Sequence, residues 1–125
     1  MAEPEWETLL AAIAHSDCVV PAPVLTELQL AMARRSAEVA AAAKALIERM
    51  LELGARIEPF EHRHASLTDA ARPKFGKGNG RGGTLNFGDL MVYAVAKQRG
   101  EPVLCTGRDF ASTDIPIHPA SRLDP

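Results

Sequence analysis

The 125-residue sequence has few of the residues that mark a secreted or membrane-spanning protein. Its two cysteines, Cys18 and Cys105, lack the CxxC spacing of a redox or zinc motif, so we expect free thiols in a reducing cytoplasm. No apolar run approaches the roughly 20 residues that span a bilayer, which predicts no membrane contact. The first ten residues, MAEPEWETLL, are acidic rather than basic, so we expect no signal peptide.

Aromatic residues and net positive charge are also scarce. Only 5% of the residues are aromatic, the formal net charge is −2 and the pI is about 6.1. A plain RNA-binding module would carry several aromatic stacking residues, and a protein whose whole surface follows nucleic acid would be basic. A local basic patch beside an acidic pocket remains compatible with this composition. The 46% hydrophobic content and the chain length predict a single globular domain, residues 1–125.

The hydrophobic pattern alternates between helical periodicity and short apolar runs, which predicts an α/β fold. Short apolar runs of this kind are typical of buried parallel strands. Helices are expected at 3–15, from about Pro23, and at 36–53, 61–72 and 86–99, and strands at 17–20, 55–60, 103–105 and 115–118.

The segment 85–115 is the part of the chain around which the rest is organised. Asn86 and Asp89 stand where a helix begins, and Gly100 can end it in the left-handed conformation. Asp109 and Asp114 follow the next expected strand. Because ligands bind at the carboxyl ends of parallel strands, we expect Asp89 and Asp109 to lie close together there. Asp114 is either a further ligand or a structural hydrogen-bonding residue.

This segment closely resembles the C-terminal half of PIN-domain ribonucleases of the VapC toxin type. The residues that carry the resemblance are LNFGD (85–89), YAVAK (93–97), GEPVL (100–104), GRDF (107–110) and TDI (113–115). The resemblance starts at about Glu3 and implies a three-layer fold, in which helices flank a short parallel sheet.

The beginning of the family pattern has no counterpart before MAEPEW. PIN domains of this type open with a short apolar strand that ends in an aspartate. We therefore expect a PIN-like fold that lacks its first central strand, and a longer natural product that carries this strand and its aspartate. Without it, the strands near Cys18 and Val103 would either pair directly or leave an open edge.

The resemblance assigns three acids to a catalytic site: Glu27, Asp89 and Asp109. Glu27, in VLTELQLA, matches the family's second acid and is expected in the first turn of its helix. Converging carboxylates repel one another and need a cation to stay ionised, and oxygen ligands suit Mg²⁺ or Mn²⁺. Asp114 is a candidate fourth ligand. Taken singly, each acid would be interpreted as structural, as a favourable residue at a helix start or in a turn.

A glycine-rich basic stretch, KFGKGNGRGG (74–83), precedes the LNFGD motif. Lys74, Lys77 and Arg81 are candidate contacts to RNA phosphates. The alternative is a mobile surface loop, and the absence of GK[ST] excludes a Walker A loop.

The function expected from these features is that of a metal-dependent endoribonuclease, the toxin of a type II toxin–antitoxin system. The resemblance implies an RNA substrate, a homodimer and a cognate antitoxin that blocks the site, and the missing first acid could impair activity. The alternative is a truncated, inactive PIN-like protein that binds an antitoxin or partner subunit without cutting RNA.

Overall fold

The computed structural model describes residues 11–12, 17–121 and 123. The chain divides into two compact units, Met1–Pro59 and Phe60–Pro125, and each is described by itself. The expected helix at 3–15 lies almost wholly outside the described residues. None of the helices in the described part is long and apolar enough to cross a membrane.

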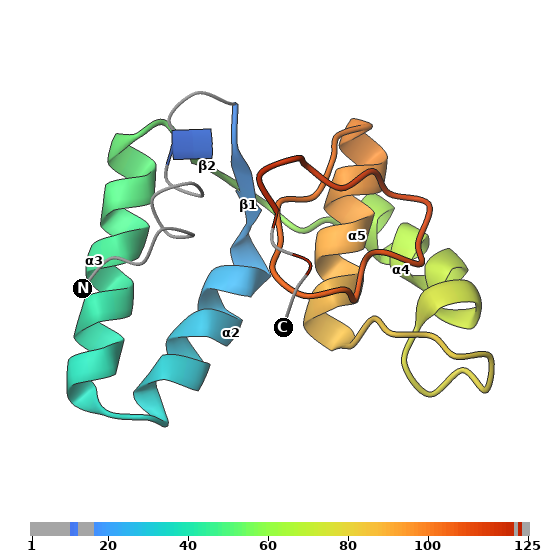
Figure 1. Ribbon diagram of the computed structural model, residues 1–125, viewed down its shortest axis with the longest axis horizontal. Coiled ribbons are helices and arrows are strands. Elements are labelled where there is room, and N and C mark those ends of the chain that lie inside the picture. The colour runs from blue at the N-terminus through green and yellow to red at the C-terminus, as the bar shows by residue number, and fades with distance from the viewer. Residues whose placement is uncertain (1–10, 13–16, 122, 124–125) are drawn as a thin grey trace. The chain divides into compact units, whose positions relative to one another are not determined.

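The first unit is built from a β-α-α-β sequence of elements (Figure 1). Strand β1 (Val19–Pro21) leads directly into helix α2 (Ala22–Ala33), and helix α3 (Ala37–Glu52) leads back to strand β2 (Arg56–Glu58). The two strands are parallel, with Val19 opposite Arg56 and Pro21 opposite Glu58. The predicted strands 17–20 and 55–60 and the predicted helices from about Pro23 and at 36–53 are therefore confirmed, with ends that differ by a few residues.

Local sequence explains where the two helices of this unit begin. Pro23 lies in the first turn of α2, where its missing N–H group has no helical partner to lose. Ser36 precedes α3, and its hydroxyl oxygen accepts a hydrogen bond from the Val39 N–H at 3.0 Å. Such a side-chain cap satisfies one of the four N–H groups that a helix start leaves unpaired.

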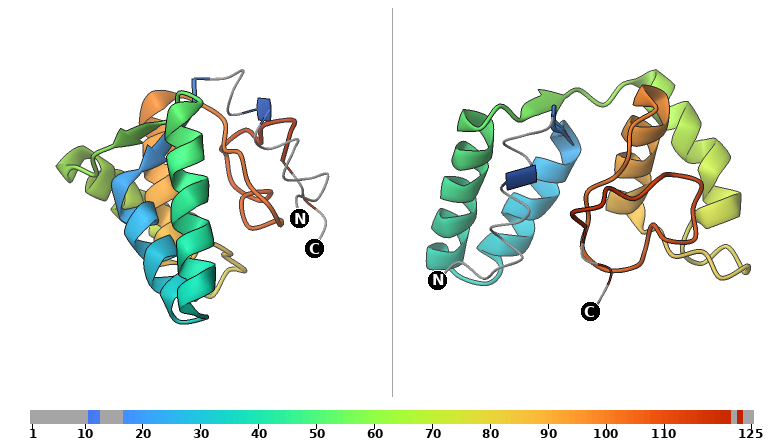
Figure 2. Two further views of the ribbon diagram at one scale, coloured as in Figure 1. Left: turned by 90° about the vertical axis from the view of Figure 1, so that its left-hand side faces the viewer. Right: turned by 45° about the horizontal axis from the view of Figure 1, so that its top comes forward.

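The second unit packs helix α4 (His62–Phe75) against helix α5 (Phe87–Arg99). The segment after α5 passes along this helix pair and supplies core residues (Figure 2). The buried core consists of Ala71, Leu85, Tyr93, Ala96, Val103, Phe110 and Ile115. Burial of these apolar side chains is the main stabilising contribution in the unit.

Helix α5 begins and ends where its sequence predicts. The Asn86 side-chain oxygen accepts a hydrogen bond from the Asp89 N–H at 2.8 Å, and the Asp89 carboxylate accepts one from the Asn86 N–H at 3.2 Å. This reciprocal capping box fixes the first turn. Gly100 ends the helix with φ 66°, a left-handed conformation that glycine adopts without steric cost.

Two elements differ from the prediction. Helix α4 continues past residue 72 to Phe75, because Pro73 lies in its last turn, where one lost hydrogen bond is tolerated. The predicted strands 103–105 and 115–118 are reduced to one parallel bridge, in which the Val103 N–H donates to Pro116 at 2.9 Å. Pro102 and Pro116 flank the bridge and have no N–H to donate, so the ladder stops after one step.

Candidate functional site

Asp89 occupies the first turn of α5 and is half-buried. Its carboxylate lies at the N-terminus of the helix, where the helix dipole is positive. The capping box with Asn86 also fixes its backbone and its side chain in one place. The sequence LNFGD therefore presents a negative charge from a rigid position.

Asp109 lies in the loop after the Val103 bridge and is exposed to solvent. The Thr84 hydroxyl donates a hydrogen bond to the Asp109 backbone carbonyl oxygen, which ties this loop to the segment that leads into α5. The neighbouring Phe110 is buried in the core and anchors the loop from the other side. Thr84 was not identified from the sequence, because its contact partner lies 25 residues away.

The Cys105 thiol is half-buried and lies within electrostatic reach of both Asp109 and Asp89. Its pKa is raised above the ordinary value by burial first, and then by the negative charges of Asp109 and Asp89. A hydrogen bond with Ser121 acts in the opposite direction. Since both charges reach one half-buried thiol, Asp89 and Asp109 form a common region of negative potential in the second unit.

Removing either negative charge should lower the pKa of Cys105. We expect Asp109→Asn to speed alkylation of Cys105 by iodoacetamide near pH 8, because a larger share of the thiol is then ionised. The rate of alkylation is measured as a function of pH by peptide mass spectrometry, which distinguishes Cys105 from Cys18. Asp69→Asn, an exposed residue of α4, is the matched control and should leave the rate unchanged. Equal rates in all three proteins would contradict the overlap of charges at Cys105.

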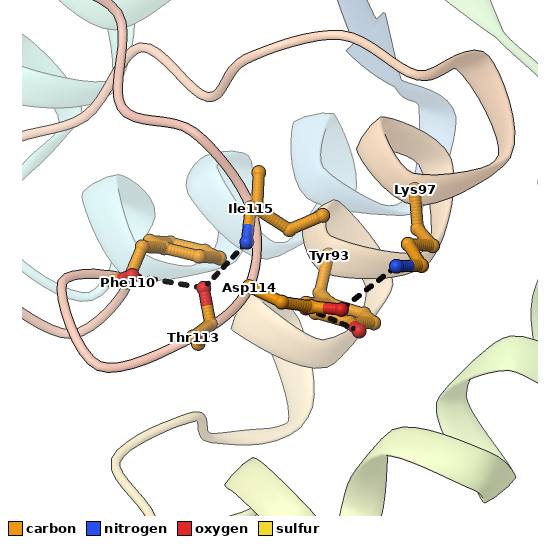
Figure 3. A network of polar contacts seen from close by, with 6 residues as sticks. All are labelled: Tyr93, Lys97, Phe110, Thr113, Asp114 and Ile115. Atoms are coloured by element: carbon orange, nitrogen blue, oxygen red, sulfur yellow. Dashed lines mark hydrogen bonds and ion pairs between the residues drawn. The ribbon is translucent and has the colours of Figure 1, made fainter.

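Asp114 has partners of its own on α5 (Figure 3). The Tyr93 hydroxyl donates to one of its carboxylate oxygens at 2.7 Å, and the Lys97 ammonium donates to the other at 2.7 Å. Lys97, and next Tyr93, hold the pKa of Asp114 below its usual range. Burial raises the pKa of Tyr93 most, and the hydrogen bond to Asp114 and the negative charge of Asp114 raise it further. These contacts fasten the loop around residue 114 to two successive turns of α5.

The Asp114 contacts make the stability of the second unit depend on pH. Because the folded-state pKa of Asp114 is depressed, its contribution is fully present above about pH 4 and is lost as the pH falls through the folded value. We expect Asp114→Asn to lower the free energy of unfolding by about 1–2 kcal/mol at pH 7, and by much less below pH 3. Urea denaturation at both pH values measures this, with Asp69→Asn as control. A loss that is equal at the two pH values would contradict the assignment.

Glu27 belongs to the first unit, Met1–Pro59. It is an exposed residue of α2. The expectation that it lies in the first helical turn is wrong, because α2 begins at Ala22, directly after β1, and Glu27 is therefore its sixth residue. The sequence placed the helix start at Pro23 or later, since proline commonly opens a helix.

A divalent cation such as Mg²⁺ needs several oxygen ligands close together. Within the part of the chain that the structure describes, no three His, Cys, Asp or Glu side chains form a metal-binding group. Two carboxylates, Asp89 and Asp109, do act together on one thiol. Mg²⁺ is commonly held by one or two carboxylates, with waters and substrate phosphates as the remaining ligands, so this pair fits such an ion.

The basic stretch 74–83 is an ordered loop rather than an unstructured connection. The Asn79 side-chain oxygen accepts hydrogen bonds from the N–H groups of Arg81 at 2.8 Å and Gly83 at 3.1 Å. The loop is closed by Lys77 N–H donating to the Leu85 carbonyl at 2.8 Å. At Gly83 a β-carbon would lie 2.1 Å from the Gly76 carbonyl oxygen, so only glycine fits there. The three cations Lys74, Lys77 and Arg81 are exposed.

Comparison with known proteins assigns the chain to a family. The PIN domain family matches residues 2–116, across both compact units. VapC ribonuclease Mb2004c of Mycobacterium bovis and Ribonuclease VapC36 of Mycobacterium tuberculosis are each 38% identical over 112 residues, which is 86% of this chain and 77% of theirs. Ribonuclease VapC28 of Mycobacterium tuberculosis is 43% identical over 72 residues, 58% of this chain and 54% of its own. The chain therefore belongs to the PIN domain family, among the proteins named VapC ribonuclease.

Proposed function

We propose that this protein is a ribonuclease toxin of the VapBC type, which hydrolyses RNA phosphodiester bonds with Mg²⁺ or Mn²⁺ held by Asp89 and Asp109. What supports the proposal is membership of the PIN domain family, together with the placement of Asp89 at the capped start of α5 and of Asp109 in the loop that Thr84 ties to the segment before α5. When bound, such an ion polarises a phosphate oxygen and lowers the pKa of a water molecule.

The chain's own residues hold and orient the charges at this site. The capping box with Asn86 fixes the Asp89 carboxylate at the start of α5. The Thr84 hydroxyl holds the Asp109 backbone in the loop after the Val103 bridge. We assign Glu27 as a further acid of the site on its sequence context. We assign Asp114 to positioning rather than to direct metal contact, because both of its oxygens accept hydrogen bonds from Tyr93 and Lys97.

The RNA backbone is proposed to contact Lys74, Lys77 and Arg81. All three cations are exposed, and none of them has a carboxylate partner among the residues that the structure describes. A cation without an internal partner is available to neutralise a phosphate, and each such contact makes binding more sensitive to salt. The net charge of −2 then confines RNA binding to this loop and its surroundings.

Partners of the protein are proposed from a different part of the surface. Leu30 of α2 is 55% exposed and Leu51 of α3 is 42% exposed, and neither helix has a fully buried residue among those described. Exposed leucines on helices are suited to docking a second subunit or an antitoxin protein. An exposed leucine of this kind also favours the second candidate function, an inactive PIN-like protein that binds such a partner without cutting RNA.

RNA cleavage separates the two candidate functions. The protein is incubated with an end-labelled single-stranded RNA in Mg²⁺, in Mn²⁺ and in EDTA, and products are resolved on a denaturing gel. The ribonuclease proposal predicts discrete products with either metal and none in EDTA. Intact RNA under all three conditions, from a protein that sediments as a dimer, would overturn it in favour of the binding protein.

A further inference from the structure

The ring of Phe87 is the most exposed large apolar side chain in the described part of the structure. It is 78% exposed, compared with 55% for Leu30, the next in order. Leaving a phenylalanine ring in water forgoes most of the roughly 1.5–3 kcal/mol that its burial would contribute. Phe87 is also the first residue of α5, directly after Asn86, so the capping box fixes the backbone that carries the ring. A rigid, exposed ring of this kind is a preformed contact surface.

The surroundings of Phe87 are cationic. Lys77 donates its backbone N–H to the Leu85 carbonyl, and Leu85 lies two residues before Phe87. Two residues of chain reach at most about 7 Å, so the basic loop and the ring are neighbours. Arg81 belongs to the same loop, whose turn is held by Asn79. An aromatic ring beside unpaired cations is the arrangement that binds single-stranded nucleic acid, where bases stack and phosphates are neutralised.

The ring and the Asp89 carboxylate point in different directions from the same helical turn. Residues two apart in an α-helix are separated by about 200° around its axis. A base on Phe87 therefore belongs to a nucleotide that flanks the one whose phosphate meets Asp89. Paired bases in a duplex cannot offer a free face, so this contact selects unpaired RNA.

We propose that Phe87 stacks on an unpaired base of the RNA at the start of α5, while Lys77 and Arg81 neutralise the adjoining phosphates. This rests on the proposed function only in taking RNA as the ligand. The contact adds one stacking residue at the site, which is consistent with a sequence of only 5% aromatic residues. It also explains why an otherwise unfavourable ring is exposed at the start of α5.

The test measures RNA binding without cleavage. A fluorescein-labelled single-stranded oligoribonucleotide is titrated with the full chain in EDTA at several salt concentrations. Base–aromatic stacking predicts that Phe87→Ala weakens binding about 5–100-fold with the salt dependence unchanged. Phe87→Trp should restore binding and Phe87→Leu should not, because leucine is apolar but has no aromatic face. Lys77→Gln is the matched contrast, and should reduce the slope of log affinity against log salt by about 0.7.

The outcomes keep this proposal separate from the ribonuclease proposal. Tight binding by the parent chain that Phe87→Ala leaves unchanged overturns the stacking role, whether or not the chain cleaves RNA. The same holds if Phe87→Leu binds as well as the parent, or if Phe87→Ala disrupts self-association and not RNA binding, since the ring would then serve a protein contact. If Phe87→Ala weakens RNA binding and the parent chain never cleaves RNA, the stacking proposal is supported and only the ribonuclease proposal is overturned. Failure of the parent chain to bind RNA at all removes both.

Discussion

Asp89→Asn should lower RNA cleavage at least about 100-fold and leave the protein folded. Asparagine has the shape of aspartate and can still accept the hydrogen bond from the Asn86 N–H, so the helix start is retained. It lacks the negative charge that an Mg²⁺ or Mn²⁺ ion requires, and the loss of a group that acts in the transition state typically costs about 10²–10⁴ in rate. Initial rates on the end-labelled RNA in Mn²⁺ measure the effect.

Two controls make the Asp89 result decisive. Asp69→Asn removes an identical charge from the exposed surface of α4 and should keep full activity. Circular dichroism of Asp89→Asn should match that of the parent chain, because the capping box keeps its geometry. Undiminished cleavage by Asp89→Asn would assign the activity to other residues or to a contaminating nuclease, and the proposed site would be wrong.

Leu85→Ala is expected to have the largest effect on stability. Leu85 is 1% exposed and packs in the core of the second unit, with Tyr93 and Phe110 in the same cluster. Its backbone also closes the basic loop, through hydrogen bonds to Phe75 and Lys77. Removing three buried carbon atoms leaves a cavity that these fixed neighbours cannot fill, which costs about 2–5 kcal/mol. Urea denaturation followed by circular dichroism at 222 nm measures the change in the free energy of unfolding.

The same substitution at an exposed leucine provides the comparison. Leu30 is 55% exposed on α2, so Leu30→Ala should cost less than about 1 kcal/mol. Comparable losses for the two variants would mean that Leu85 is not part of a packed core. The account of how the core holds both the loop and the start of α5 would then have to be abandoned.

The features predicted correctly from sequence are those that short-range chemistry decides. The start of α5 follows from Asn86 and Asp89, which are three residues apart, and its end follows from Gly100. The parallel pairing of β1 with β2 follows from short apolar runs separated by helices. Capping, helix periodicity and strand length all depend on residues within a few positions of one another, so a single sequence contains the necessary information.

The features missed depend on contacts between distant residues. Asp114 is bound by Tyr93, 21 residues away, and by Lys97, 17 residues away. Nothing in the local sequence distinguishes an aspartate with such partners from a metal ligand. The hydrogen bonds that Asn79 makes within the basic loop were not predicted, because five glycines left a mobile loop as an open alternative. Whether acids from separate elements meet is decided by tertiary packing.

Binding of Mn²⁺ to the full chain tests the central claim most directly, because it needs neither RNA nor cleavage. Titration followed by electron paramagnetic resonance should reveal a site that both Asp89→Asn and Asp109→Asn weaken. Even an outer-shell change costs about 10–100-fold in metal affinity, so each loss should be at least about tenfold. The double variant should lose no more Mn²⁺ binding free energy than the two single variants lose together, because both carboxylates bind the same ion. Mn²⁺ affinity that is unchanged in either single variant would contradict the claim that Asp89 and Asp109 hold a common metal ion.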